Sequence, residues 1–135
     1  MPAMLLTDLS KIIIPLLTDD LRRPPWKGSS NPLAGHCYVA SEVAFYILPG
    51  GWRPTFIRHE GSPHWFLRHD NGEILDLTAP QFKTPVPHHL GIGKGFLTKT
   101  PSKRAKSVLC KIPAHFCTVY NRFWIGIESK PPSGL

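Results

Sequence analysis

The fold is decided by the stretch Asn31-Pro32-Leu33-Ala34-Gly35-His36-Cys37, which leads into Tyr38-Val39-Ala40-Ser41-Glu42-Val43-Ala44-Phe45-Tyr46-Ile47-Leu48. Proline and glycine predict a loop before Cys37, and no helix breaker follows until Pro49. The apolar residues then recur with helical spacing as a buried stripe: Val39, Ala40, Val43 and Ile47. The pattern therefore predicts a helix that begins at Cys37.

A cysteine on the first turn of a helix is suited to nucleophilic chemistry. Unpaired N–H groups and the positive end of the helix dipole lower the pKa of a thiol there and can also bind an oxyanion. We therefore interpret Cys37 as a catalytic nucleophile. The competing interpretation is a buried core thiol, which is common for cysteine.

A base and an acid follow the thiol in the order that a Cys-His-Asp triad requires. His64 opens the predicted strand His64-Trp65-Phe66-Leu67-Arg68, and Asp76 lies in the next one, Glu73-Ile74-Leu75-Asp76-Leu77-Thr78. In such a triad His64 takes the proton of Cys37 and later protonates the leaving group. Asp76 holds the tautomer and the orientation of the imidazole.

Three ordered boxes resemble those of the YunG-like proteins. They read Asn31-Pro32-Leu33-Ala34-Gly35-His36-Cys37, His64-Trp65-Phe66 and Asp76-Leu77-Thr78-Ala79-Pro80-Gln81-Phe82, and together they span roughly residues 31 to 82. The resemblance implies the fold of the papain-like cysteine hydrolases. We accordingly expect a small α+β domain in which helices flank a three- to four-stranded antiparallel sheet, with the nucleophile at the N-terminus of a helix.

The hairpin between the two strands decides whether His64 and Asp76 can meet. A two-residue Asn71-Gly72 loop would set Leu67 opposite Asp76 and would put His64 on the other face of the sheet. A three-residue loop from Asp70 to Gly72, with Gly72 at positive φ, would set Phe66 opposite Asp76. His64 and Asp76 would then be diagonal neighbours on one face, so the triad requires the three-residue loop.

Other candidate site residues surround the predicted triad. Asn31 lies six residues before the thiol, the spacing at which papain-like enzymes carry a side-chain amide for the oxyanion. The alternative for Asn31 is a turn residue before Pro32. We expect Trp65, Gln81 and His36 to bind substrate, although His36 lies on a different face of the helix from Cys37.

The charge of the chain is strongly basic and unevenly distributed. Its 135 residues carry a net charge of +7, with a pI of about 9.6. No acidic residue occurs between Asp76 and Glu128, a part of the chain that contains eight lysines and arginines. Such a surface attracts anionic partners, and we expect Lys103, Arg104 and Lys106 to contact the partner. The alternative is that these charges form a solvated face that only keeps the protein soluble.

The remaining segments predict packing elements. Asp8 to Leu21 has an apolar helical face that Pro15 should kink or split. Thr100 caps a helix whose buried stripe is Ala105, Val108, Leu109 and Ile112, and a last helix carries Phe116, Val119, Tyr120, Phe123, Trp124 and Ile127.

Two weaker patterns carry less chemistry than the triad. The glycine run at Gly91, Gly93 and Gly95 follows no clear strand and is a poor nucleotide fingerprint. A zinc site from Cys110, His115 and Cys117 matches no structural spacing, and we predict neither a metal nor a cofactor.

These patterns lead to one expected organisation. We expect one domain over residues 1–128 and a flexible tail over 129–135. Three cysteines without a framework, no membrane span and no signal-like segment predict a cytoplasmic protein of undetermined oligomeric state.

The expected function is acyl transfer through a thioester. The enzyme would be an amidase, a peptidase or a deamidase that acts on a peptide, a protein or a small-molecule amide. One variant of this function is a phage or bacterial effector that modifies one protein partner. The alternative function is a non-catalytic module whose basic half binds nucleic acid or an acidic protein.

Overall fold

The computed structural model describes residues 2–113, which form a small α+β domain. Three α-helices, α1 (Pro2–Ile13), α2 (Cys37–Ile47) and α3 (Lys103–Leu109), accompany four strands, β1 (Trp52–His59), β2 (Ser62–His69), β3 (Ile74–Leu75) and β4 (Ile92–Gly93). The strands make one antiparallel sheet in the order β3-β2-β1-β4. This architecture confirms the predicted fold class at the level of a helix-flanked antiparallel sheet.

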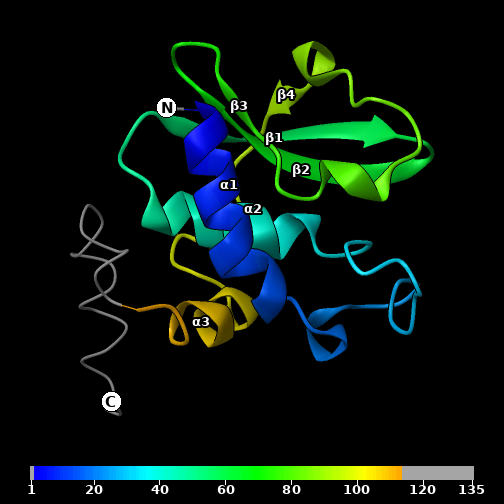
Figure 1. Ribbon diagram of the computed structural model, residues 1–135. Helices are drawn as coiled ribbons and strands as arrows, with labels where there is room; N and C mark the ends of the chain where they lie inside the picture. The colour runs from blue at the N-terminus through cyan, green and yellow to red at the C-terminus, as the bar shows by residue number, and fades with distance from the viewer. Residues whose placement is uncertain (1, 114–135) are drawn as a thin grey trace.

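Helix α2 is the centre of the packing. It begins at Cys37 as predicted and ends at Ile47, two residues before Pro49, which cannot donate a helical hydrogen bond. Its predicted stripe is buried against the sheet and α3, and Figure 1 shows the sheet on one side of α2 and α3 on the other. The helix that presents Cys37 is thus packed on both sides.

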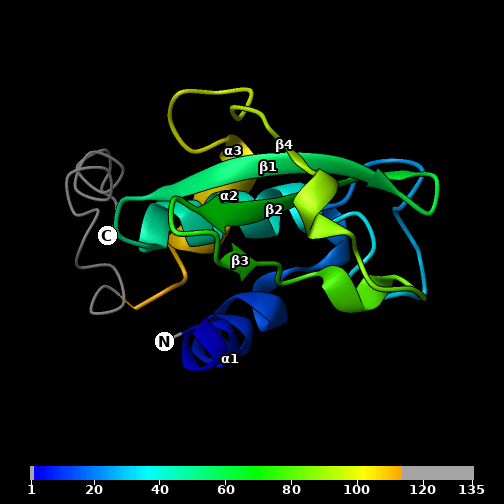
Figure 2. The same cartoon turned by 90° about the horizontal axis from the view of Figure 1, so that it is seen from above.

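The sheet separates two apolar layers. Leu67 and Leu75 face α2 and belong to the main core, whereas Phe66 faces the other way and packs with Ile57 and Val86. The second layer is covered by the segment 79–90, which includes the short 3-10 turns η3 (Ala79–Gln81) and η4 (His88–Leu90). In Figure 2 this segment runs along the sheet on the side opposite α2.

The hairpin has the register that the triad requires. Leu67 pairs with Leu75 and Arg68 with Ile74, so the same register sets Phe66 opposite Asp76. The His69 N–H donates to the Glu73 carbonyl at 2.8 Å, which closes a three-residue loop, and Gly72 has a φ of +95°. The three-residue loop and the left-handed glycine are both confirmed.

The flanking helices follow the sequence with one correction. Helix α1 gives way at Ile14 to a 3-10 turn, η1 (Ile14–Leu16), which contains Pro15 as the predicted break. The cap of α3 is Ser102 and not Thr100, because the Ser102 hydroxyl accepts from the Ala105 N–H at 3.2 Å. Buried Glu42 in turn accepts from the Ser102 N–H and hydroxyl at 2.6 and 2.7 Å, which fixes the start of α3 to α2.

Some expectations fall outside the described residues. The predicted last helix, the tail over 129–135 and two of the three zinc candidates, His115 and Cys117, belong to this part. Within residues 2–113, none of the helices has the length and apolar character needed to cross a bilayer.

Candidate active site

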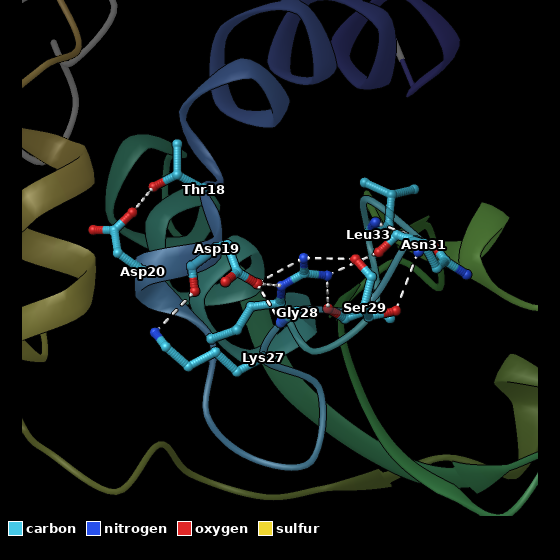
Figure 3. A network of polar contacts seen from close by, with 10 residues as sticks. Thr18, Asp19, Asp20, Lys27, Gly28, Ser29, Asn31 and Leu33 are labelled. Atoms are coloured by element: carbon cyan, nitrogen blue, oxygen red, sulfur yellow. Dashed lines mark hydrogen bonds and ion pairs between the residues drawn. The ribbon is translucent and has the colours of Figure 1, made fainter.

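The loop that delivers Cys37 is held by one buried arginine. Arg22, 8 % exposed, donates to three backbone carbonyls of the loop: those of Ser29 at 3.0 Å, Asn31 at 2.8 Å and Ala34 at 3.1 Å. Its guanidinium also binds the Asp19 carboxylate at 2.8 Å, and Asp19 accepts from the Gly28 N–H at 2.7 Å (Figure 3). Charged donors on three carbonyls fix the conformation of the loop.

A glycine completes the approach to the thiol. Gly35 has a φ of +82°, and a Cβ there would lie 2.5 Å from the Cβ of Trp26. Any other residue would therefore suffer backbone strain as well as a collision with the indole. The position accounts for glycine two residues before Cys37.

Cys37 lies against the strand that carries His64. Its Sγ lies 3.9 Å from the Pro63 carbonyl oxygen, and the Trp65 N–H also contributes to its surroundings. Burial raises the pKa of the thiol to about 11, since it outweighs that N–H, and the Asp76 carboxylate adds to the increase. The N–H groups of Cys37 and Tyr38 at the helix start do lower the pKa of the thiol, as expected, but desolvation is larger and the net shift is upward.

Alkylation should report this elevated pKa. The rate at Cys37 should rise with pH toward a midpoint near 11, because only the thiolate reacts and burial disfavours it. Peptide mapping after timed iodoacetamide pulses measures the rate, and exposed Cys110 in the same sample is the internal control. A midpoint below 8 would contradict this account of the resting thiol.

His64 and Asp76 form a buried pair with a third member. The Nε2 of His64 lies 2.7 Å from Oδ2 of Asp76, and the Nε2 of His88 reaches the same oxygen at 2.8 Å. Burial by itself would raise the pKa of Asp76, but the hydrogen bonds from His64 and His88 outweigh it and keep the pKa below its ordinary value. Asp76 is therefore a carboxylate shared by two imidazoles.

This pairing fixes the state of His64. With its Nε2 proton donated to Asp76, its Nδ1 is an acceptor. The Nδ1 is buried and has no partner within residues 2–113, and the ring is fully buried between Phe66 and Phe82. A neutral imidazole with an unused acceptor has the electronic form of a general base.

The thiol and the imidazole are not hydrogen-bonded to each other. His64 shares the sheet face of Phe66, whereas Cys37 begins the helix on the opposite face and meets β2 at the backbone of the residues on either side of His64. The hydrogen bonds of the described residues include His64 to Asp76 but not Cys37 to His64. The predicted position of the ring is confirmed on the carboxylate side only.

A pocket with a volume of about 160 Å³ opens over the thiol. Of the residues expected at the site, Cys37, Trp65 and Gln81 line it, together with Trp26 and Tyr38. The side-chain nitrogen of Gln81 is buried and has no partner in the described part of the chain. Gln81 therefore brings an unused amide donor to the wall of the pocket.

Asn31 has the structural role that was the alternative interpretation. Its Oδ1 accepts from the Leu33 N–H at 3.1 Å, which makes a turn before the helix. Its Nδ2 donates to the Gln81 carbonyl at 3.1 Å. The amide is thus used to join the loop to η3, and Asn31 is absent from the pocket lining.

His36 is also displaced from its expected role. Its side chain is 1 % exposed, it does not line the pocket, and neither ring nitrogen has a partner within residues 2–113. Burial lowers the pKa of His36 to about 4, and the charges of Arg22 and Arg104 lower it further. His36 is a buried neutral imidazole at the start of α2 and not a surface for substrate.

The state of His36 predicts acid sensitivity. Between pH 6.5 and about 4, His36 is protonated in the unfolded chain and neutral in the folded chain. The free energy of unfolding therefore decreases as the pH falls. Since one pKa unit corresponds to about 1.4 kcal/mol, the free energy of unfolding at pH 4 should be lower by about 3 kcal/mol because of His36. Urea unfolding should show His36→Leu losing less stability than the wild type over this range, by about that amount. The exposed His89→Gln is the matched control, and equal losses in both variants would contradict the assignment.

Two contributors escaped the sequence analysis. Arg22 belongs to no motif of the sequence analysis, and no local pattern marks its carbonyl partners. His88 lies in the long segment 79–100, whose length is itself a signal of function. Arg68, which donates to the carbonyls of His88 and Gly91, holds that segment in place.

The described residues contain no cluster of three or more side chains suited to a metal ion. Comparison of the chain with protein-family models, with curated proteins and with solved structures finds no match in any of the three.

Proposed function

We propose that the chain is a cysteine-dependent acyl-transfer enzyme of papain-like type, with Cys37 as nucleophile, His64 as base and Asp76 as the residue that orients His64. The observation that carries the proposal is the buried His64-Asp76 pair, in which Nε2 and Oδ2 lie 2.7 Å apart and His64 Nδ1 has no partner within residues 2–113. The residues before and after His64, Pro63 and Trp65, contact Cys37 through their backbone. A core thiol would not require a fixed imidazole tautomer beside it. The resemblance to the YunG-like proteins supports the same assignment.

The proposed reaction proceeds through a thioester. In this reaction Sγ has to leave its contact with Pro63 and reach His64 Nδ1, which points to the other face of β2. There it gives up its proton and attacks the carbonyl carbon of an amide. The carbonyl oxygen becomes an oxyanion, held by the Cys37 N–H and, in place of Asn31, by the Gln81 amide. Collapse breaks the C–N bond, and His64 returns its proton to the leaving amine. Water or a second amine then releases the acyl group and restores the thiol.

The elevated pKa of the thiol determines how such an enzyme would start. A thiol with a pKa near 11 is protonated at neutral pH, so the resting site holds a neutral thiol. Proton transfer then accompanies attack and does not precede it. Substrate that displaces Sγ from Pro63 would create the Cys37-His64 contact only in the productive complex.

The same pKa favours a second candidate, a non-catalytic binding module that retains the fold. In that case the pocket binds a ligand while Cys37 remains an inert thiol. Turnover of a panel of peptide and small-molecule amides, with products identified by mass spectrometry, separates the two candidates. Product that forms with the wild type and not with Cys37→Ala supports the enzyme. Binding of panel members without turnover supports the module.

A further inference from the structure

Two arginines line the same pocket as Cys37. Arg23 follows Arg22, the arginine that holds the loop before Cys37, and Arg104 belongs to α3. Segments distant in sequence therefore bring two positive charges to one place. Both also line an adjoining pocket together with Tyr38 and Lys103. The positive charge therefore extends from the thiol toward the start of α3.

Neither arginine has a carboxylate partner among residues 2–113. Arg104 donates through Nη1 to the Leu21 carbonyl at 2.8 Å, and its Nε is buried with no partner. Arg23 is exposed, and its side chain makes neither a hydrogen bond nor an ion pair within the same residues. Glu42, an acid whose charge acts on Arg104, is already bound to Ser102.

This arrangement is electrostatically unfavourable in the empty protein. Burial lowers the pKa of Arg104, and the neighbouring charge of Arg23 lowers it further. A guanidinium that is partly desolvated, beside a like charge and without a counter-ion, gains most from a bound anion. Guanidinium groups also match the geometry of a carboxylate or phosphate, to which each can donate two hydrogen bonds.

We propose that Arg23 and Arg104 form an anion subsite of the Cys37 pocket, which binds the carboxylate or phosphate group of an acidic substrate. The reading of this anion as part of a substrate rests on the proposed function, but the subsite itself does not. It differs from the basic surface expected from the sequence, since Lys106 lines neither pocket and Arg23 comes from another segment.

The first test uses anions alone and is independent of the thiol. Nitrogen-15 NMR of the arginine side chains follows the Nε–H signal of Arg104, which burial should protect from exchange with water, during titration with sodium acetate and with sodium phosphate. We expect a saturable shift, weakened severalfold by Arg23→Gln and unchanged by Arg58→Gln. The Arg58→Gln substitution removes a charge of the same sign at an exposed position of β1 that does not line the pocket. The anion that saturates at the lower concentration identifies the group.

The second test uses two of the three cysteines, Cys37 and Cys110, as reporters. Iodoacetate and iodoacetamide deliver the same alkylating carbon with and without a carboxylate. The ratio of their rates at Cys37 should exceed the ratio at exposed Cys110 by roughly tenfold at low salt, as expected for electrostatic steering into a pocket. High salt should reduce this preference. Arg23→Gln should decrease it severalfold, and Arg104→Lys, which keeps the charge, should retain most of it.

The outcomes separate the two proposals. Absence of a saturable Arg104 shift with either anion, or an iodoacetate preference at Cys37 equal to that at Cys110, overturns the subsite whatever the enzyme does. Anion binding in a protein that turns over no amide supports the subsite and argues against the proposed function. Should Arg104→Lys fail to fold, Arg23→Gln alone decides, because the exposed Arg23 side chain makes no hydrogen bond or ion pair within residues 2–113.

Discussion

Cys37→Ala should abolish amide turnover while the protein remains folded. A nucleophile has no substitute in a covalent mechanism, so the loss should reach about three to six orders of magnitude. The residue is only partly buried, and the contacts of its thiol are with the backbone, with the Pro63 carbonyl at 3.9 Å and with the Trp65 N–H. The free energy of unfolding should therefore change by about 1 kcal/mol or less.

Two readouts make this result decisive. Turnover is followed on whichever amide of the panel the wild type accepts, and stability is followed by urea unfolding of the same preparations. Cys110→Ala is the matched control, because it removes an exposed thiol that lies outside the pocket. Full activity in Cys37→Ala would remove the enzyme hypothesis, and loss of folding would favour the core-thiol interpretation.

Asp76→Asn should reduce the turnover number by about four orders of magnitude with little effect on substrate binding. The asparagine has the same shape, but its amide can donate to Nε2 and so leaves the proton of His64 on Nδ1, where a base must be vacant. Loss of the charge also removes the partner of His88. The variant tests the tautomer and not merely the packing.

The kinetics should distinguish a catalytic from a structural effect. We expect kcat to fall and KM to stay within a few fold, because Asp76 does not line the pocket. Asp70→Asn, a change of the same kind at an exposed position of the hairpin loop, should leave kcat unaffected. An Asp76→Asn enzyme with unchanged kcat would make the His64-Asp76 pair a structural feature.

The sequence was informative wherever a local rule determined the structure. Helix α2 starts at Cys37 because loop-forming residues give way there to an unbroken apolar period. The hairpin register follows from the loop Asp70-Asn71-Gly72. Because side chains alternate along a strand, only a three-residue loop puts His64 and Asp76 on the same face of the sheet. Local periodicity was sufficient for α2, whereas turn chemistry left the hairpin loop open between two and three residues and only the requirement for a triad favoured three.

Burial and long-range contacts were not accessible in the same way. The dipole argument predicted a low pKa for Cys37, but the cost of desolvation depends on Trp65 and its neighbours, which the sequence cannot place. Asn31 has the spacing of an oxyanion residue, yet its amide is used by Leu33 and by Gln81. The convergence of Arg23 and Arg104 likewise depends on how α3 packs on α2.

The central claim is that Cys37 carries an acyl group which His64 helps to load. Its most direct test is acid quenching during turnover of an accepted amide, followed by intact-mass measurement and peptide mapping. The account predicts a hydroxylamine-sensitive adduct on Cys37 and not on Cys110, which forms in the wild type and is absent from a folded His64→Gln protein. An adduct that forms equally well without His64, or turnover with no adduct on Cys37 under conditions in which the acyl group is trapped, would contradict it.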